Sequence, residues 1–302
     1  MNLRSINLQL KLVTASAVAL AFAICIAAVF GVERDESRFV EFFKETLAPG
    51  KGNDYPLNRM PSKFPVCVYG DRMERTEKWT TLFFELLSEE TWINPRLHYV
   101  KRTIDCARDT LLYVFYHQSD KNTLSTIVGD VSFILKRSGL PEFHFIYDNF
   151  GFGHVFYEKG KEPRAYVAVN EALDVETKSV DDSIARNVIQ QELLQVVLVA
   201  PDRFVTTGPV SIIEERELPE LAGTNTILTA EQMAARFELN VPNMCLYDIM
   251  LLKTIYANDP AIIDGRLGTY LSYIHAHYDY LVLSALRIQS DPRYQDLFKK
   301  KC

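Results

Sequence analysis

The feature that most constrains this chain is an uncharged, apolar run near its N-terminus. The run covers residues 12–31, LVTASAVALAFAICIAAVFG, and follows Arg4 and Lys11. Because about 20 apolar residues span a bilayer, it predicts a transmembrane helix. The basic flank predicts that the N-terminus stays in the cytoplasm, so that everything after Glu33 lies outside it. We therefore expect a protein anchored in the membrane by its N-terminal helix, with its folded part outside the cytoplasm.

A cleaved signal peptide is the competing interpretation of the same run. Val29 and Gly31 offer small residues where a signal peptidase acts, although they do not form a clean Ala-x-Ala site. The chain would then be secreted after cleavage. Either interpretation places the rest of the chain in a compartment that permits disulfides.

Five cysteines occur in the sequence, and two of them are candidates for a disulfide. Cys67 and Cys106 form this candidate pair. The alternative is that both, together with Cys245, are small buried hydrophobic residues. No C-x-x-C pair is present, so the cysteines predict neither a structural zinc knuckle nor a thioredoxin-type site.

The charge balance bears on the partners that the chain can bind. The 302 residues carry a net charge of -6. Nucleic-acid binding depends on clustered Lys and Arg that neutralise phosphates, and the short tail of lysines at residues 299–301 is the most basic stretch. We expect no nucleic-acid partner.

Proline and glycine divide the chain into segments. We expect a signal anchor or signal peptide over residues 1–32 and a linker over 33–62. An α+β subdomain should follow over 63–200, and a mainly helical C-terminal subdomain should pack on it over 201–302. Within the linker, PGKGNDYPLNRMPSK holds three prolines and two glycines, a composition typical of a tether.

Hydrophobic spacing predicts the elements of the folded part. Strands are expected at residues 63–70, 97–102, 110–118, 154–159 and 164–170. Helices are expected at residues 73–92, 123–139, 181–199, 229–238, 244–257 and 266–288. Strands that come mostly first and helices that come mostly later indicate the α+β class rather than a doubly wound sheet.

The helix predicted over 181–199 contains QELLQ, which has the spacing of the zinc-peptidase signature H-E-x-x-H. Residues four apart share a helix face, so Gln191 and Gln195 project together with Glu192 beside them. A glutamine amide oxygen is a poor substitute for the imidazole, thiolate or carboxylate ligands of zinc. The helix therefore predicts no bound metal and no cofactor, and the alternative is that this loose pattern arises by coincidence.

A strand, a helix and further strands that lead into such a helix form the layout of the zincin catalytic subdomain. The stretches QELLQVVLVAPD, SIIEE (211–215) and YDIMLLKTIYANDP (247–260) resemble a family of bacterial extracytoplasmic proteins of unknown function with a degenerate zincin-like helix. The matching residues are Glu192, Leu193, Gln195, Asp202, Ser211, Ile212, Asp248, Leu251, Leu252 and Tyr256. The resemblance implies a zincin-like mixed sheet, a periplasmic setting and no particular reaction. The family's glycine is missing at Val197 and Leu198, which leaves a tight turn there without support.

Other candidate sites are weaker. DNFGFGH (148–154) lacks G-x-G-x-x-G spacing and indicates a glycine-rich hairpin or cleft loop. Phe150 and Phe152 in it could form an apolar rim of a binding cleft, and the alternative is that they pack onto the sheet. His275 and His277 fall on different helix faces, which disfavours joint metal binding.

These observations favour a non-catalytic binding protein. Gln191, Glu192 and Gln195 would line the old cleft, and an edge strand at 154–159 could take up an extended peptide, protein or cell-wall partner. The alternative is a peptidase-like hydrolase that uses Glu192 as its general base, which needs a raised pKa of that carboxyl group. A third possibility is a structural envelope component whose cleft is filled.

Overall fold

The computed structural model describes residues 36–71, 74–118, 122–142, 151–158, 160–171, 183–201, 203–205, 211–216, 244–258, 262 and 264–298. The chain divides into two compact units, Met1–Phe42 and Phe43–Cys302. The first unit is described over the beginning of helix α2 (Glu36–Leu47), where the rings of Phe39 and Phe42 lie 6.3 Å apart. The membrane-spanning run predicted at 12–31 lies outside the described residues, and no helix within them is long and apolar enough to cross a bilayer.

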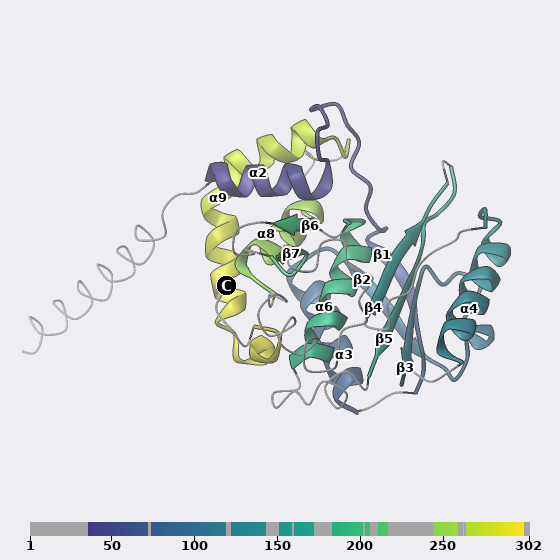
Figure 1. Ribbon diagram of the computed structural model, residues 1–302. Helices are drawn as coiled ribbons and strands as arrows, with labels where there is room; N and C mark the ends of the chain where they lie inside the picture. Colours follow the sequence, from purple (N-terminus) through teal and green to yellow (C-terminus); the bar gives the residue numbers. More distant parts are fainter. Residues whose placement is uncertain are drawn as a thin grey trace, which may run out of the picture. The chain divides into compact units, whose positions relative to one another are not determined.

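The second unit is built on a five-stranded mixed sheet in the order β2-β1-β3-β5-β4 (Figure 1). The strands are β1 (Lys63–Gly70), β2 (Asn94–Tyr99), β3 (Leu112–His117), β4 (Gly151–Phe156) and β5 (Arg164–Asn170). Neighbouring strands are parallel except at one edge, where β4 pairs antiparallel with β5. The predicted strand pair is confirmed, although β4 begins at Gly151 rather than at His154.

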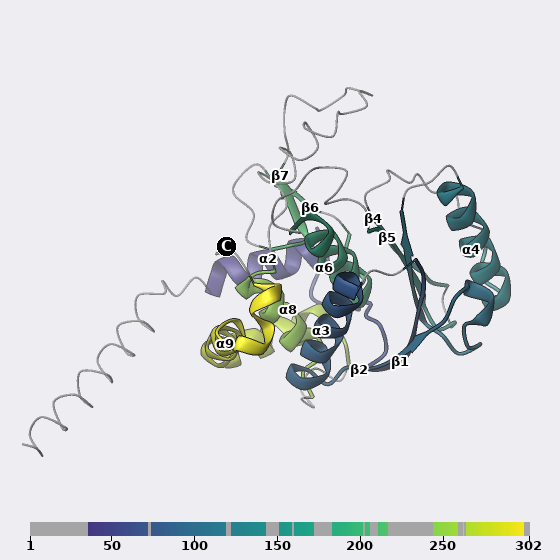
Figure 2. The ribbon, with the colours of Figure 1, turned by 90° about the horizontal axis from the view of Figure 1, so that it is seen from below.

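Helices cover both faces of this sheet. Helices α3 (Glu74–Glu90) and α6 (Ser183–Leu198) lie on one face, and α4 (Thr123–Ser138) lies on the other, as Figure 2 shows. Strands β1, β3 and β5 are therefore buried along almost their whole length, and the edge strands β2 and β4 remain partly exposed. The predicted α+β class, with a mixed sheet followed by a helical C-terminal part, is confirmed.

The C-terminal part consists of α8 (Leu246–Ile255), α9 (Leu267–Gln289) and the 3₁₀ helix η3 (Pro292–Leu297). A short parallel pair, β6 (Arg203–Val205) and β7 (Glu214–Arg216), precedes them. Charged side chains connect this part to the end of α3: the ammonium group of Lys253 lies 3.4 Å from the Glu90 carboxylate, which Arg287 also contacts. The helix predicted at 229–238 lies outside the described residues.

The linker predicted over 33–62 is instead partly folded. Helix α2 occupies part of this range, and Leu57 donates a backbone hydrogen bond to Gly265 at 2.9 Å. Leu267 donates to Tyr55 at 2.9 Å, and the side chain of Met60 is buried. Proline and glycine in this stretch disfavour helix but not pairing with a distant backbone segment, and local composition carries no information about such a partner.

Helix α6 ends in a tight turn although the expected glycine is missing. Val199 has φ of 54°, in the left-handed region, and the Ala200 N–H donates to the Gln195 carbonyl at 2.9 Å. This bond is that of a Schellman motif, which usually places glycine at the left-handed position. The end of the helix is also held by the C-terminal part, because the Tyr256 hydroxyl donates to the Val197 carbonyl at 2.6 Å. A tight turn is therefore present at the end of α6, although the sequence offers no glycine at Val197 or Leu198. Val199 adopts the left-handed conformation there, which residues with a side chain disfavour.

A disulfide joins Cys67 to Cys106, with the two Cα atoms 5.8 Å apart, and confirms the candidate pair. Cys245 is disulfide-bonded as well, so these three cysteines are not the unpaired hydrophobic residues of the alternative. Around Cys106, Arg137 of α4 donates to its carbonyl at 3.1 Å. The neighbouring Thr103 hydroxyl donates to Asp130 of α4, which also accepts a bond from Tyr69 of β1 at 2.6 Å. The β2–β3 connection is thus fastened to both α4 and the sheet.

Replacing both Cys67 and Cys106 with alanine should lower the free energy of unfolding by about 2–4 kcal/mol. The two cysteines are 39 residues apart, and closing a loop of that length removes substantial entropy from the unfolded chain. Urea unfolding followed by circular dichroism measures the change. An unchanged unfolding midpoint would contradict this role of the disulfide.

Candidate functional site

Helix α6 is surrounded by protein on almost every side. All side chains from Ile184 to Leu198 are buried except that of Glu192, which is half-buried. Gln191 and Gln195 are each 5% exposed, so both amide side chains are buried. Glu192 is therefore the one side chain along this stretch that reaches partly toward solvent.

Glu192 lies directly against the backbone of the edge strand β4. A Cβ atom added to Gly151 would come within 2.8 Å of Oε1 of Glu192 and 2.5 Å of Val188 Cγ1. A Cβ atom added to Gly153 would collide with Oε2 of the same carboxylate and would lie 3.3 Å from Val196 Cγ1. Glycine at these two positions is what allows the helix to approach the strand so closely. The G-F-G of the glycine-rich stretch was the sequence signal for this close approach. Its role becomes clear only with the position of Glu192 on α6.

The two glutamines lie next to Glu192 on the helix. Helical spacing places Gln191 and Gln195 together on one side of Glu192, and their amides can both donate and accept hydrogen bonds. The backbone of Gln195 also closes the turn at the end of the helix. The structure thus places Glu192 beside β4, with Gln191 and Gln195 buried next to it on the same helix.

Phe152 does not join them. Successive strand side chains point to opposite faces, and its neighbours Gly151 and Gly153 face α6. Phe152 packs against the core on the α4 face, where its ring stacks on His154 at 6.1 Å and lies 6.3 Å from that of Tyr166. Packing onto the sheet, the alternative to an apolar rim, is therefore the correct interpretation for Phe152. Phe150 lies outside the described residues.

The face of α6 turned away from Glu192 carries buried polar groups that the signature did not suggest. Arg186 is buried and donates to Asn187 Oδ1 at 3.4 Å. Gln190, one turn further, is completely buried, and neither atom of its amide has a hydrogen-bond partner among the described residues. The four-residue spacing of Arg186 and Gln190, which places them on one side of the helix, was the available signal in the sequence.

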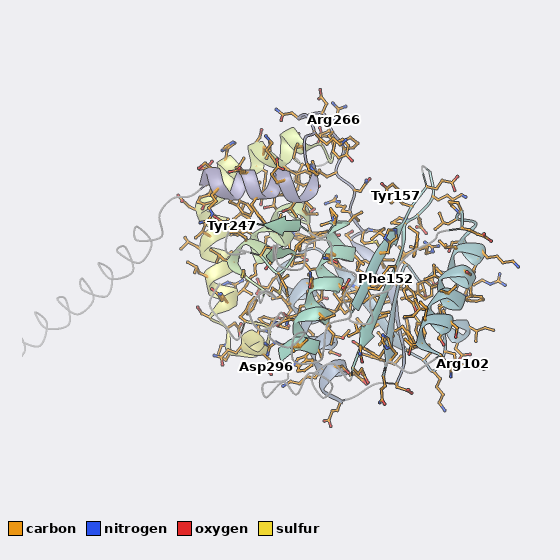
Figure 3. All side chains as sticks on the ribbon, in the orientation of Figure 1. Arg102, Phe152, Tyr157, Tyr247, Arg266 and Asp296 are labelled. Atoms are coloured by element: carbon orange, nitrogen blue, oxygen red, sulfur yellow. A yellow bond between two sulfur atoms is a disulfide. The ribbon has the colours of Figure 1, made fainter. Side chains whose placement is uncertain are left out.

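A small pocket lies on the α4 face of the sheet, where β4 ends. Its volume is about 170 Å³, and it is lined by Leu140, Pro141, Glu142, His154, Val155, Phe156 and Tyr157. Figure 3 labels Phe152 and Tyr157, which mark the strand and the residue that follows it. Burial lowers the pKa of the His154 imidazole. The pocket was not predicted, because it forms between the end of α4 and a strand that comes later in the chain.

The remaining candidates have structural roles. The buried carboxylate of Asp248 accepts hydrogen bonds from the backbone of Cys245 at 2.7 Å and of Ile212 at 3.0 Å, which anchors the start of α8. His277 stacks on Tyr273 and bonds to its carbonyl, and His275 is exposed on α9. Within the described residues, no group of three or more His, Cys, Asp and Glu side chains is arranged to hold a metal ion.

Comparison with known proteins adds no family to this picture. The chain matches no family model, no curated protein and no solved structure. Its site is therefore interpreted from its own geometry.

Replacing Gly153 with alanine should lower the free energy of unfolding by about 1–3 kcal/mol, because the new methyl group overlaps the Glu192 carboxylate. When Glu192 is already alanine, the Gly153→Ala replacement should lower the free energy of unfolding by less than it does in the wild type. Gly129→Ala on α4, where a Cβ atom meets nothing within 4 Å, is the matched control and should not destabilise. Urea unfolding of the four variants measures the coupling, and strictly additive effects would contradict the contact.

The stability contributed at His154 should depend on pH. Its folded-state pKa lies below the ordinary value of 6.5, so between these two values the unfolded chain binds more protons than the folded chain. Stability is therefore fully present above pH 6.5 and falls as the pH drops toward the folded pKa. Urea unfolding at about pH 7.5 and about pH 5.5 should show a larger loss for the wild type than for His154→Gln. His275→Gln, at an exposed position, should behave like the wild type.

Proposed function

We propose that this chain is an extracytoplasmic, membrane-anchored binding protein with a zincin-like domain, and that it takes up an extended peptide segment along β4 without hydrolysing it. The contact between Glu192 of α6 and the two glycines of the edge strand carries the proposal. It places the only half-buried polar group of the degenerate signature next to the backbone with which an extended ligand would pair.

The position of β4 supports strand addition. It is the last strand of the five-stranded sheet, and its residues are half-buried except for Phe156. An edge strand presents N–H and C=O groups that can pair with an added segment, and no further strand lies beyond β4 in the described part of the chain. Peptide recognition by β-augmentation uses such an edge, with main-chain bonds for affinity and flanking side chains for specificity.

The chemistry of α6 supports binding rather than zinc-dependent hydrolysis. Gln191 and Gln195 stand where a zinc peptidase has histidines, and their neutral amides bind zinc poorly. The loss of metal ligands and the retention of the Glu192 carboxylate beside β4 are therefore consistent with recognition.

The cysteines support the proposed location. A buried Cys67–Cys106 disulfide forms and persists in oxidising compartments such as the bacterial periplasm. The apolar run at 12–31 would hold the chain in the membrane, with secretion after cleavage as the alternative.

A peptide hydrolase that uses Glu192 as general base is the second candidate. It is favoured by the position of the Glu192 carboxylate beside β4, where an extended substrate would lie within its reach. It requires an activated water without the usual zinc ligands.

Binding of labelled peptides to the full-length chain in detergent tests the proposal. The probes are fluorescein-labelled decapeptides of strand-forming residues and the same peptides with N-methyl groups on alternate residues, which cannot pair as a strand. Fluorescence anisotropy should show binding of the first set and loss of binding for the second. Hydrogen exchange should show protection of β4 amides when peptide is bound.

Chromatography of the same mixtures, with and without added zinc, separates the two candidates. Intact peptides support a binding protein. Cleavage that Glu192→Gln abolishes and Glu85→Gln leaves unchanged would establish the hydrolase instead, since Glu85 is an exposed carboxylate on α3. Failure of every peptide to bind would contradict both and favour a structural envelope component.

A further inference from the structure

We propose that the pocket at the end of β4 binds a lysine or arginine side chain of the extended segment that adds to this strand. The inference rests on the proposed function and specifies its ligand: an extended peptide with a basic residue near one end of the paired region. The pocket is defined by Leu140–Glu142, after α4, and His154–Tyr157, at the end of β4.

The size of the pocket fits one side chain. Its volume of about 170 Å³ is below the ~300–1,000 Å³ of sites that enclose a small-molecule ligand. Its position beside an edge strand fits a side chain that projects from a paired segment, because side chains of an added strand fall alternately on the two faces of the sheet. The pocket lies on the α4 face, opposite Glu192.

The walls of the pocket fit an aliphatic stem with a cationic end. Leu140 and the buried ring of Phe156 provide apolar surface for the methylene groups. The ring of Tyr157 is 62% exposed at the rim, where a cation can lie over its face. His154 is depressed in pKa by burial, so at neutral pH it adds no positive charge that would oppose a basic side chain.

Charge complementarity selects a cation over a neutral or acidic side chain. Glu142 lines the pocket, is exposed, and has no hydrogen-bond or ion-pair partner among the described residues. Two cations of the β4–β5 hairpin are already engaged: Lys161 contacts Glu158 at 2.7 Å, and Arg164 contacts Glu162 at 3.6 Å. The net charge of -6 also favours a cationic partner.

Three decapeptides of alternating Thr-X sequence, with X as Lys, Gln or Glu, provide the test against the full-length chain in detergent. Binding is measured by anisotropy at about 0.15 M ionic strength to suppress distant attraction. The wild type should bind the Lys peptide about 3–10-fold more tightly than the Gln peptide. Glu142→Gln should reduce this ratio to about one, and Glu85→Gln, which changes the net charge equally at a distant site, should preserve it.

Charge reversal provides the second variant. Glu142→Lys should bind the Glu peptide more tightly than the Lys peptide, and far-ultraviolet circular dichroism checks that the exposed substitution leaves the fold intact. A Lys preference that survives in Glu142→Gln would overturn the inference, because it would then reflect general attraction. Peptide binding that is indifferent to X would overturn the inference but leave the proposed function standing. Failure of all three peptides to bind would overturn both.

Discussion

The close packing of α6 on β4 is the contact on which the rest of this structure depends. A helix buried on nearly all sides needs cover from several directions: here β4, β5 and α3 pack against it, and Tyr256 of the C-terminal part bonds to its Val197 carbonyl. The approach to β4 is possible only because Gly151 and Gly153 have no side chains. The same contact leaves Glu192 half-buried at the sheet edge, so one packing constraint creates both the stability of the domain and its candidate site.

The two faces of the edge strand differ in chemistry. On the α6 face lies the Glu192 carboxylate, and on the α4 face lie the rings of Phe152, His154 and Phe156 and the pocket with Glu142. Because strand side chains alternate, a segment paired with β4 would present successive residues to these two environments in turn. Such an arrangement is consistent with the proposed recognition of an extended peptide. Zinc-dependent chemistry would need ligands that α6 lacks.

Polar groups inside the fold define how its parts fit together. Asp130 joins α4 to β1 and to the β2–β3 connection, and Asp248 joins the start of α8 to residues 211–212. Asp248 is buried and Asp130 is half-buried. A carboxylate withdrawn from water is costly unless it accepts several hydrogen bonds, so each of these groups favours one arrangement of its neighbours over others. The disulfide between Cys67 and Cys106 adds a covalent link between β1 and the β2–β3 connection, the two segments that Asp130 also joins.

The sequence by itself determined the elements and the limits of the chemistry. Periodicity located β1, β3, α4 and α6 to within a few residues, and glutamine at two signature positions argued against zinc, because both follow from local spacing and side-chain type. Tertiary structure alone decided that residues 53–57 pair with the start of α9, that Phe152 turns away from Glu192, and that β4 and the residues after α4 enclose a pocket. These features depend on contacts between segments far apart in the chain, and local patterns of hydrophobicity and charge do not specify which distant segment will be the partner.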